Sequence, residues 1–234
     1  LRSRSREIGV LFTPGNLDPA LYSSPILRRV FDVMTRTELH ASIERYPDVV
    51  NRDLAGDVGE DTRRSVVIDT SSVAQSDWLS TLAKSGFYLA PSGVVMPMCH
   101  NIIEAMSVGT IPVTQYPHLF WPQLVPGETC IRFTDEEDLH EKIAGVLAME
   151  DDAVSAMRDR VISYYERNLR PGANTERALA LIGSSRHTEQ LFIVAGAAVL
   201  RSRGWRTPLS WRADLAFHSL RRRLSGFIRT FRNG

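Results

Sequence analysis

Residues 87–113 read FYLAPSGVVMPMCHNIIEAMSVGTIPV, and this stretch decides the fold. Its apolar start, Phe87 to Ala90, is typical of a buried strand, and Thr110 to Thr114 resumes β character. Between them we expect a loop and then a helix, with Pro97 at its first position and Gly109 just past its end. Proline lacks the amide hydrogen that would have no partner in the first turn of a helix. Glycine readily adopts the left-handed backbone conformation that ends a helix. The stretch therefore predicts a strand, loop, helix and strand of a parallel sheet.

The same alternation continues on both sides of this stretch. Short apolar runs indicate buried strands, apolar residues at helical spacing indicate helices, and a polar, Gly- and Asp-rich segment indicates a loop. The further elements that we expect are strands at Ile8–Thr13, Val66–Asp69 and Cys130–Phe133, helices over 24–46, 76–84 (capped by Ser76), 135–149 and 151–168, and a loop over 48–64. Strands that alternate with helices predict an α/β, Rossmann-like, mostly parallel sheet with helices on both faces.

The composition sets limits on the class of protein. The chain has 234 residues, of which 43% are hydrophobic, so it can form one large domain or a domain with an appendage. The formal net charge of +1 gives no overall field that would favour a nucleic-acid partner. Two cysteines, Cys99 and Cys130, form neither a disulfide framework nor a metal cluster, which favours a reducing, cytoplasmic compartment. The longest apolar run, Leu191–Leu200, is too short to cross a membrane.

The pattern changes near residue 171, so we expect a first domain over 1–170 and a helical, Arg-rich extension over 171–234. Residues 201–234 contain nine arginines and a single acidic residue, Asp214. Apolar and basic residues recur at helical spacing over 210–231, which predicts a basic amphipathic helix. Two interpretations stay open: the helix lies on an anionic membrane surface, or it packs back onto the sheet domain with its arginines in solvent.

The loop and helix after the central strand have the chemistry of an anion site. Helix N-termini and the carboxyl ends of parallel strands bind phosphorylated ligands well. Gly93 allows a ligand to approach the backbone closely, and Ser92 offers a hydroxyl. His100, Asn101 and Glu104 share one helix face, where the carboxylate could accept two hydrogen bonds from a ribose diol. The alternative is that the glutamate is an ordinary exposed helix residue and the loop a mere connector.

The run from Ser92 to Val113, SGVVMPMCHNIIEAMSVGTIPV, resembles the donor-binding segment of GT-B glycosyltransferases, and most of all the exostosin-like group. The resemblance covers about residues 7 to 170 and is most specific around Glu-Ala-Met and Gly-Thr-Ile-Pro-Val. It implies that this region is a nucleotide-sugar-binding domain, one half of a GT-B fold. The matching glutamate of the family contacts the ribose, a role that falls to Glu104. Ser92, Gly93 and the helix start would face the diphosphate.

One departure from the family concerns mechanism. Retaining members of the superfamily pair two glutamates eight positions apart, and here Met96 stands eight before Glu104. The resemblance therefore implies an inverting enzyme or a domain without activity. The sequence has no Asp-x-Asp motif, which predicts that no metal or other cofactor is needed.

Without a metal, the departing diphosphate must be stabilised by backbone amides and by basic side chains. Arg28, Arg36 and His100 are the candidates. Gly15 and Asn16 follow the first strand and are expected to line the same cleft, since ligands bind at carboxyl strand ends in such sheets.

The expected function is transfer of a sugar from a nucleotide-activated donor to a glycan or lipid-linked acceptor. GT-B enzymes usually place the acceptor site and the catalytic base in a facing N-terminal domain, so we expect this chain to be the donor half of a larger enzyme, peripheral to a membrane. We assign no catalytic residue. Two alternatives stay open: a degenerate, non-catalytic domain that acts as a membrane-associated interaction module, or another α/β nucleotide-binding protein that shares only the topology.

Overall fold

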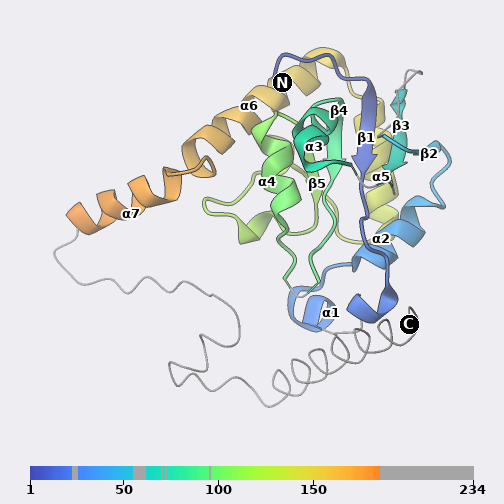
Figure 1. Cartoon of the computed structure of the whole chain (residues 1–234), viewed down its shortest axis with the longest axis horizontal. Coiled ribbons are helices and arrows are strands. Elements are labelled where there is room, and N and C mark those ends of the chain that lie inside the picture. Colours follow the sequence, from blue (N-terminus) through green and yellow to red (C-terminus); the bar gives the residue numbers. More distant parts are fainter. Residues whose placement is uncertain (23–25, 55–61, 70, 72, 95, 185–234) are drawn as a thin grey trace, which may run out of the picture. The chain divides into compact units, whose positions relative to one another are not determined.

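The computed structural model describes residues 1–22, 26–54, 62–69, 71, 73–94 and 96–184 (Figure 1). The predicted amphipathic helix over 210–231 lies outside the described residues. The chain divides into two compact units after Pro171, and α7 (Ala173–Ser184) is the described part of the second unit. The first unit contains the sheet.

The described strands form one parallel sheet in the order β2-β3-β1-β4-β5-β6, which confirms the α/β, Rossmann-like prediction. The strands are β1 (Ile8–Phe12), β2 (Val49–Arg52), β3 (Thr62–Asp69), β4 (Ser85–Leu89), β5 (Ile111–Thr114) and β6 (Ile131–Arg132). Every residue of β1, β4 and β5 is buried, because both faces of these strands are covered. Val10 pairs with Val66 on one side and Phe87 on the other, so β1 lies at the centre of the core.

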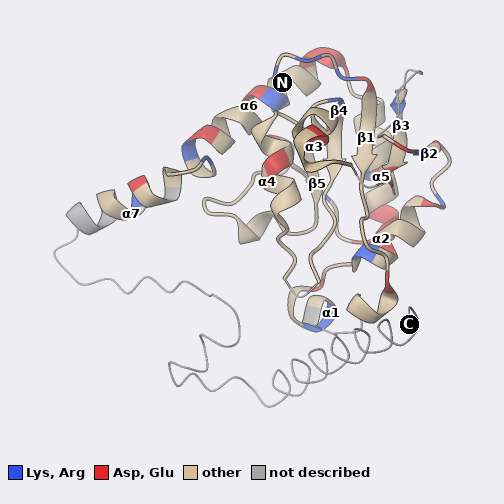
Figure 2. Cartoon of the chain, viewed as in Figure 1, with Lys and Arg blue, Asp and Glu red and all other residues tan. Residues whose placement is uncertain are grey.

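Helices cover both faces of the sheet (Figure 1). They are α1 (Ile26–Phe31), α2 (Arg36–Ile43), α3 (Gln75–Leu82), α4 (His100–Ser107), α5 (Glu136–Leu147) and α6 (Asp151–Asn168), with short 3-10 turns at Pro19–Tyr22 and Pro117–Leu119. The helices α3 and α4 pack over β4 and β5, and α5 packs over β1 and β3 on the opposite face. Charged residues are absent from β1, β4 and β5 (Figure 2), as expected for strands buried on both sides.

The prediction of a loop over 48–64 was wrong at both ends. The edge strand β2 occupies Val49–Arg52, and β3 begins at Thr62. Both stretches carry exposed or half-exposed side chains, Arg63 and Arg64 among them, so they lack the continuous apolar run that marks the central strands. The strand β2 tolerates this polarity because it lies at the edge of the sheet and has no neighbour on one side. The strand β3 lies between β2 and β1, but Arg63 and Arg64 precede the residues of β3 that pair with β2.

The single helix expected over 24–46 is two helices. Asp32 has a φ of 51° and ends the first, and Thr35 starts the second with a capping box. The Thr35 hydroxyl accepts from the Glu38 amide at 3.3 Å, and the Glu38 carboxylate accepts from the Thr35 amide at 2.6 Å. The Thr-x-x-Glu spacing that produces this box is visible in the sequence and could have predicted the break.

The starts of α3 and α4 differ from the predictions, whereas α6 begins at Asp151 as predicted. The helix α4 begins at His100, three residues after the predicted Pro97, because the Pro97 carbonyl instead accepts from the Gly93 amide at 3.2 Å in the preceding loop. The residue before α3 is Ala74, so Ser76 is not its cap. The sequence offers Thr134 or Asp135 as the cap of α5, and the cap is Asp135, which accepts from the Asp138 amide at 3.0 Å.

Gly109 ends α4 with a φ of 80°, which confirms the predicted left-handed stop. A Cβ at this position would lie 3.0 Å from Cδ1 of Ile162 and 3.1 Å from Cγ of Arg158. We therefore predict that Gly109→Ala lowers the free energy of unfolding by about 1–2 kcal/mol for the backbone strain alone. The matched control is Gly145→Ala in α5, where a Cβ meets no atom within 4 Å, and which should raise the free energy of unfolding by about 0.5–1 kcal/mol. Denaturant unfolding measures both, and equal effects of the two substitutions would contradict the left-handed stop.

Candidate functional site

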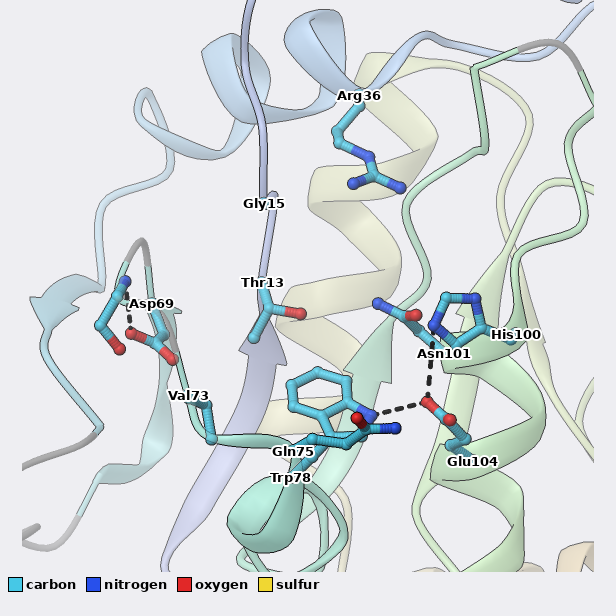
Figure 3. A pocket seen from close by; sticks show the side chains of 11 residues that line it. Thr13, Gly15, Arg36, Asp69, Val73, Gln75, Trp78, His100, Asn101 and Glu104 are labelled. Atoms are coloured by element: carbon cyan, nitrogen blue, oxygen red, sulfur yellow. Dashed lines mark hydrogen bonds and ion pairs between the residues drawn. The ribbon is translucent and has the colours of Figure 1, made fainter.

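A cavity of about 310 Å³ opens at the carboxyl ends of β1, β3 and β4. Its wall is formed by Thr13, Gly15, Arg36, Asp69, Ser71, Val73, Gln75, Trp78, His100, Asn101 and Glu104 (Figure 3). After β1 the chain adds β2 and β3 on one side of it, and then β4, β5 and β6 on the other side. The direction in which strands are added therefore reverses between β1 and β4. Such a reversal is where parallel sheets bind ligands, because the loops on either side diverge and leave a crevice.

Glu104 is the one charged residue of α4 (Figure 2), and it faces this cavity. Its side chain is 34% exposed. Oε2 accepts a hydrogen bond from Trp78 Nε1 at 2.6 Å and lies 4.0 Å from Nε2 of His100, one turn earlier (Figure 3). Among the described residues, Oε1 has no hydrogen-bond partner. The carboxylate is thus oriented by an indole and retains an oxygen that can accept from a ligand.

A buried phenol joins the elements beneath the cavity. The hydroxyl of Tyr88, on β4, lies 2.9 Å from the Thr13 hydroxyl and accepts a hydrogen bond from Nδ2 of Asn101 at 3.3 Å. The Trp78 ring stands edge-on to the Tyr88 ring, with centroids 6.4 Å apart. Burial raises the pKa of Tyr88 to about 12, and its two hydrogen bonds oppose that rise. These contacts fix β1, β4, α3 and α4 relative to one another.

Arg36 joins the two loops that border the cavity. Nη1 donates to the Pro14 carbonyl at 2.9 Å, and Nε and Nη2 each donate to the Ser92 carbonyl at 3.2 Å. Gly15 has a φ of 64°, and a Cβ there would lie 2.9 Å from Nη1 of Arg36. The glycine is therefore required both by its backbone conformation and by the guanidinium beside it. Arg36 supplies a full positive charge to one side of the cavity.

Five of the nine residues predicted from sequence line this cavity: Gly15, Arg36, His100, Asn101 and Glu104. Ser92 does not, because it is fully buried and its hydroxyl donates to the Met34 carbonyl at 2.9 Å. Gly93 is also outside the cavity wall. A Cβ on Gly93 would lie 2.5 Å from the Met96 carbonyl oxygen, so the loop's own backbone, and not a ligand, explains this glycine.

The other two predicted residues make local contacts. Arg28 donates to the Glu38 carboxylate at 2.9 Å in an exposed ion pair. Asn16 accepts from the Asp18 amide through its side chain at 2.9 Å. Neither residue borders the cavity, so Arg36 is the arginine that the fold places at the site.

Sequence reasoning missed Asp69, Ser71 and Trp78. Asp69 was assigned to the end of a strand and Trp78 to a helix, but neither was connected to the site. In such sheets a carboxylate at the end of a strand adjacent to the first strand commonly faces the ligand. Only the sheet order, in which β3 borders β1, makes this adjacency visible.

Other potential sites are limited in the part of the chain that the structure describes. No group of three or more His, Cys, Asp or Glu side chains there is arranged to hold a metal ion. None of the described helices combines the length and apolarity needed to cross a membrane. Both cysteines are free, and burial raises the pKa of the Cys130 thiol to about 12, which makes it an unreactive core residue.

Comparison with known proteins adds little to this geometry. No protein-family model matches the chain, and no curated protein sequence is significantly similar to it. Among solved structures, the chain is similar to the N-terminal domain of trehalose-6-phosphate phosphatase from Candida albicans, at 11% identity and a TM-score of 0.43. The match covers 76% of this chain and 42% of that structure, so the chain spans less than half of its length. A likeness at this level carries no argument about activity.

The buried phenol yields a pH prediction. Because the folded-state pKa of Tyr88 is raised from 10.0 to about 12, the unfolded chain loses this proton first as the pH rises. The stability associated with the neutral phenol is fully present below pH 10 and is lost between pH 10 and about pH 12, by on the order of 2–3 kcal/mol. We predict that Tyr88→Phe flattens the fall of unfolding free energy over this interval. Thr13→Val, which keeps the phenol, should retain the fall. An unchanged slope in Tyr88→Phe would contradict the burial of an ionisable group there.

Proposed function

We propose that this chain binds a nucleotide-activated sugar in the cavity and is the donor-binding part of an exostosin-like glycosyltransferase of GT-B architecture. The observation that carries the proposal is the position of Glu104. It lies in the segment whose sequence resembles the family's donor site, and its carboxylate faces the cavity where the sheet order reverses. A carboxylate in this position suits a ligand with a vicinal diol, because it accepts two hydrogen bonds and donates none.

The positively charged groups of the cavity wall suit a diphosphate. Gln75 and His100, the first residues of α3 and α4, both line the cavity, and the residues before them, Ala74 and Cys99, make no side-chain cap bond. Each helix start thus leaves backbone amides without a side-chain partner and contributes part of a positive charge. Arg36 adds a full charge at a part of the wall apart from Gln75 (Figure 3). Phosphate groups bind well to such a combination.

The ribose would then lie at Glu104. Its Oε1 is without a partner among the described residues, and Oε2 is shared with Trp78. A ribose diol can donate one hydrogen bond to each oxygen. A hydrogen bond to a charged group contributes roughly 1.5–3 kcal/mol. This interaction would fix the nucleotide relative to the phosphate side of the cavity.

Transfer from such a donor proceeds without a metal in this proposal. A hydroxyl of a glycan or lipid-linked acceptor attacks the anomeric carbon of the sugar, the bond from that carbon to the diphosphate oxygen breaks, and the nucleoside diphosphate leaves. Arg36 and the amides at the start of α4 stabilise the negative charge that develops on it. Met96 stands where retaining members of the superfamily have the other glutamate of the pair, which favours inversion. The base that takes the acceptor proton is expected from a facing domain.

The test is nucleotide binding. Thermal shift against a panel of nucleoside diphosphates should show stabilisation by one of them. Glu104→Ala should weaken binding of that diphosphate roughly ten- to a hundredfold, because it removes one or two hydrogen bonds to a charged acceptor. Glu141→Ala, on the exposed face of α5 with a side chain 78% exposed, is the matched control and should leave the affinity unchanged.

Two results would contradict the proposal in different ways. Failure of every nucleoside diphosphate and nucleotide sugar to stabilise the wild-type chain would overturn the donor-binding function itself. Normal affinity in Glu104→Ala would keep nucleotide binding but remove the glutamate from the ribose contact.

A further inference from the structure

The cavity has a second acidic side, formed by Asp69 at the end of β3. Asp69 is only 2% exposed. Its Oδ1 accepts from the Ser71 amide at 2.9 Å and from the Leu54 amide at 3.4 Å. Within the part of the chain that the structure describes, its Oδ2 is buried without a hydrogen-bond partner, and so is the hydroxyl oxygen of Ser71. Both residues line the cavity, and Figure 3 shows Asp69 and Glu104 on opposite sides of it, with Thr13 between them.

Unpartnered buried oxygens of this kind are unfavourable in a folded protein. A buried acceptor without a donor costs about 1–3 kcal/mol, and more when it is charged. Most buried polar groups therefore have partners, and each exception calls for an explanation. Here two exceptions fall on neighbouring side chains in the wall of one cavity. Both atoms are buried, so a ligand reaches them only when neighbouring side chains move.

The two atoms have complementary hydrogen-bonding roles. A carboxylate oxygen only accepts, whereas a serine hydroxyl can donate as well as accept. Together they can pair with a ligand edge that presents an N–H next to a carbonyl oxygen or ring nitrogen. The edges of nucleobases have this arrangement of donors beside acceptors.

The surfaces between the two acidic sides suit a flat, partly apolar group. Val73 and Trp78 line the cavity between Asp69 and Glu104 (Figure 3). A base bound there would be flanked by an aliphatic and an aromatic side chain, and stacking on aromatic side chains is a common mode of base recognition. The negative charge of Asp69 also disfavours a phosphate at this end, so a bound nucleotide would direct its diphosphate towards Arg36.

We propose that Asp69 and Ser71 form a base-recognition subsite, in which Oδ2 of Asp69 accepts an N–H from the nucleobase and the Ser71 hydroxyl donates to the atom beside it. This inference rests on the proposed function, since it assigns the base of the same nucleotide whose ribose lies at Glu104. It makes Asp69 a specificity-determining residue, because a base with a different donor pattern would leave the carboxylate unpaired.

The decisive variant is Asp69→Asn. It retains an oxygen for the Ser71 amide but replaces the second oxygen with an NH₂ donor. We expect binding of the preferred nucleoside diphosphate to weaken at least tenfold and the order of preference among the bases to change. Binding of ribose 5-diphosphate, which carries no base, should be unaffected. Ser71→Ala should show the same selective loss, smaller in size. Asp77→Asn, an exposed acid on α3 outside the cavity wall, is the control and should bind all probes as the wild type does.

Several outcomes would overturn the subsite while leaving the proposed function intact. Wild-type affinity and base preference in both Asp69→Asn and Ser71→Ala would do so. Equal weakening of ribose 5-diphosphate would show that Asp69 acts on the whole cavity and not on the base. A loss confined to the nucleotide sugar would assign the carboxylate to a sugar hydroxyl. Failure of wild-type protein to bind any of the probes would instead overturn the proposed function, and the subsite with it.

Discussion

The pairing of β1 with β4 is the constraint on which the rest of this structure depends. Both strands are buried on both faces, so their backbone groups must be satisfied within the sheet, and their loops must diverge where the strand order reverses. The cavity exists because of that divergence. The Tyr88 phenol, held between Thr13 and Asn101, keeps the two strand ends and α4 in register beneath it. Arg36 joins the loops above, through the carbonyls of Pro14 and Ser92.

The helices, strands and loops around the cavity place positive charge and hydrogen-bond acceptors at different parts of its wall. Two helix starts and Arg36 bring positive charge to the cavity wall, and Glu104 and Asp69 place acceptors on opposite sides of the cavity. A ligand that fits this pattern carries negative charge at one end and hydrogen-bond donors elsewhere. A nucleoside diphosphate has these features, with donors on the ribose and on the base. The pattern is thus more informative than the volume, since about 310 Å³ alone would accept many small molecules.

Sequence patterns predict the central part of this fold well and the periphery poorly, for physical reasons. Strands such as β1 and β4 are recognisable because complete burial demands continuous apolar runs, and Gly109 is recognisable because its left-handed backbone favours glycine. The edge strand β2 need not be buried on both faces, so its sequence predicts a loop. Within the site, Glu104 could be predicted because it is a lone carboxylate on an apolar helix. Asp69 could not, because its role depends on β3 lying beside β1, which local sequence does not encode. Ser92 and Gly93 were assigned to the ligand although the loop itself uses them.

The hydrogen bond from Trp78 Nε1 to Glu104 Oε2 offers the most direct test of the central claim, that a nucleotide binds in this cavity with its ribose at Glu104. The chain has four tryptophans, so four indole N–H resonances can be followed by ¹⁵N-labelled NMR while a nucleoside diphosphate is added, with Trp78→Phe identifying the relevant one. We expect the Trp78 resonance to shift in proportion to binding and to saturate with it, because the ribose competes for the same carboxylate, and we expect Glu104→Gln to change its starting position. A Trp78 resonance that stays in place when the protein is saturated with nucleotide would show that the ribose does not bind at Glu104.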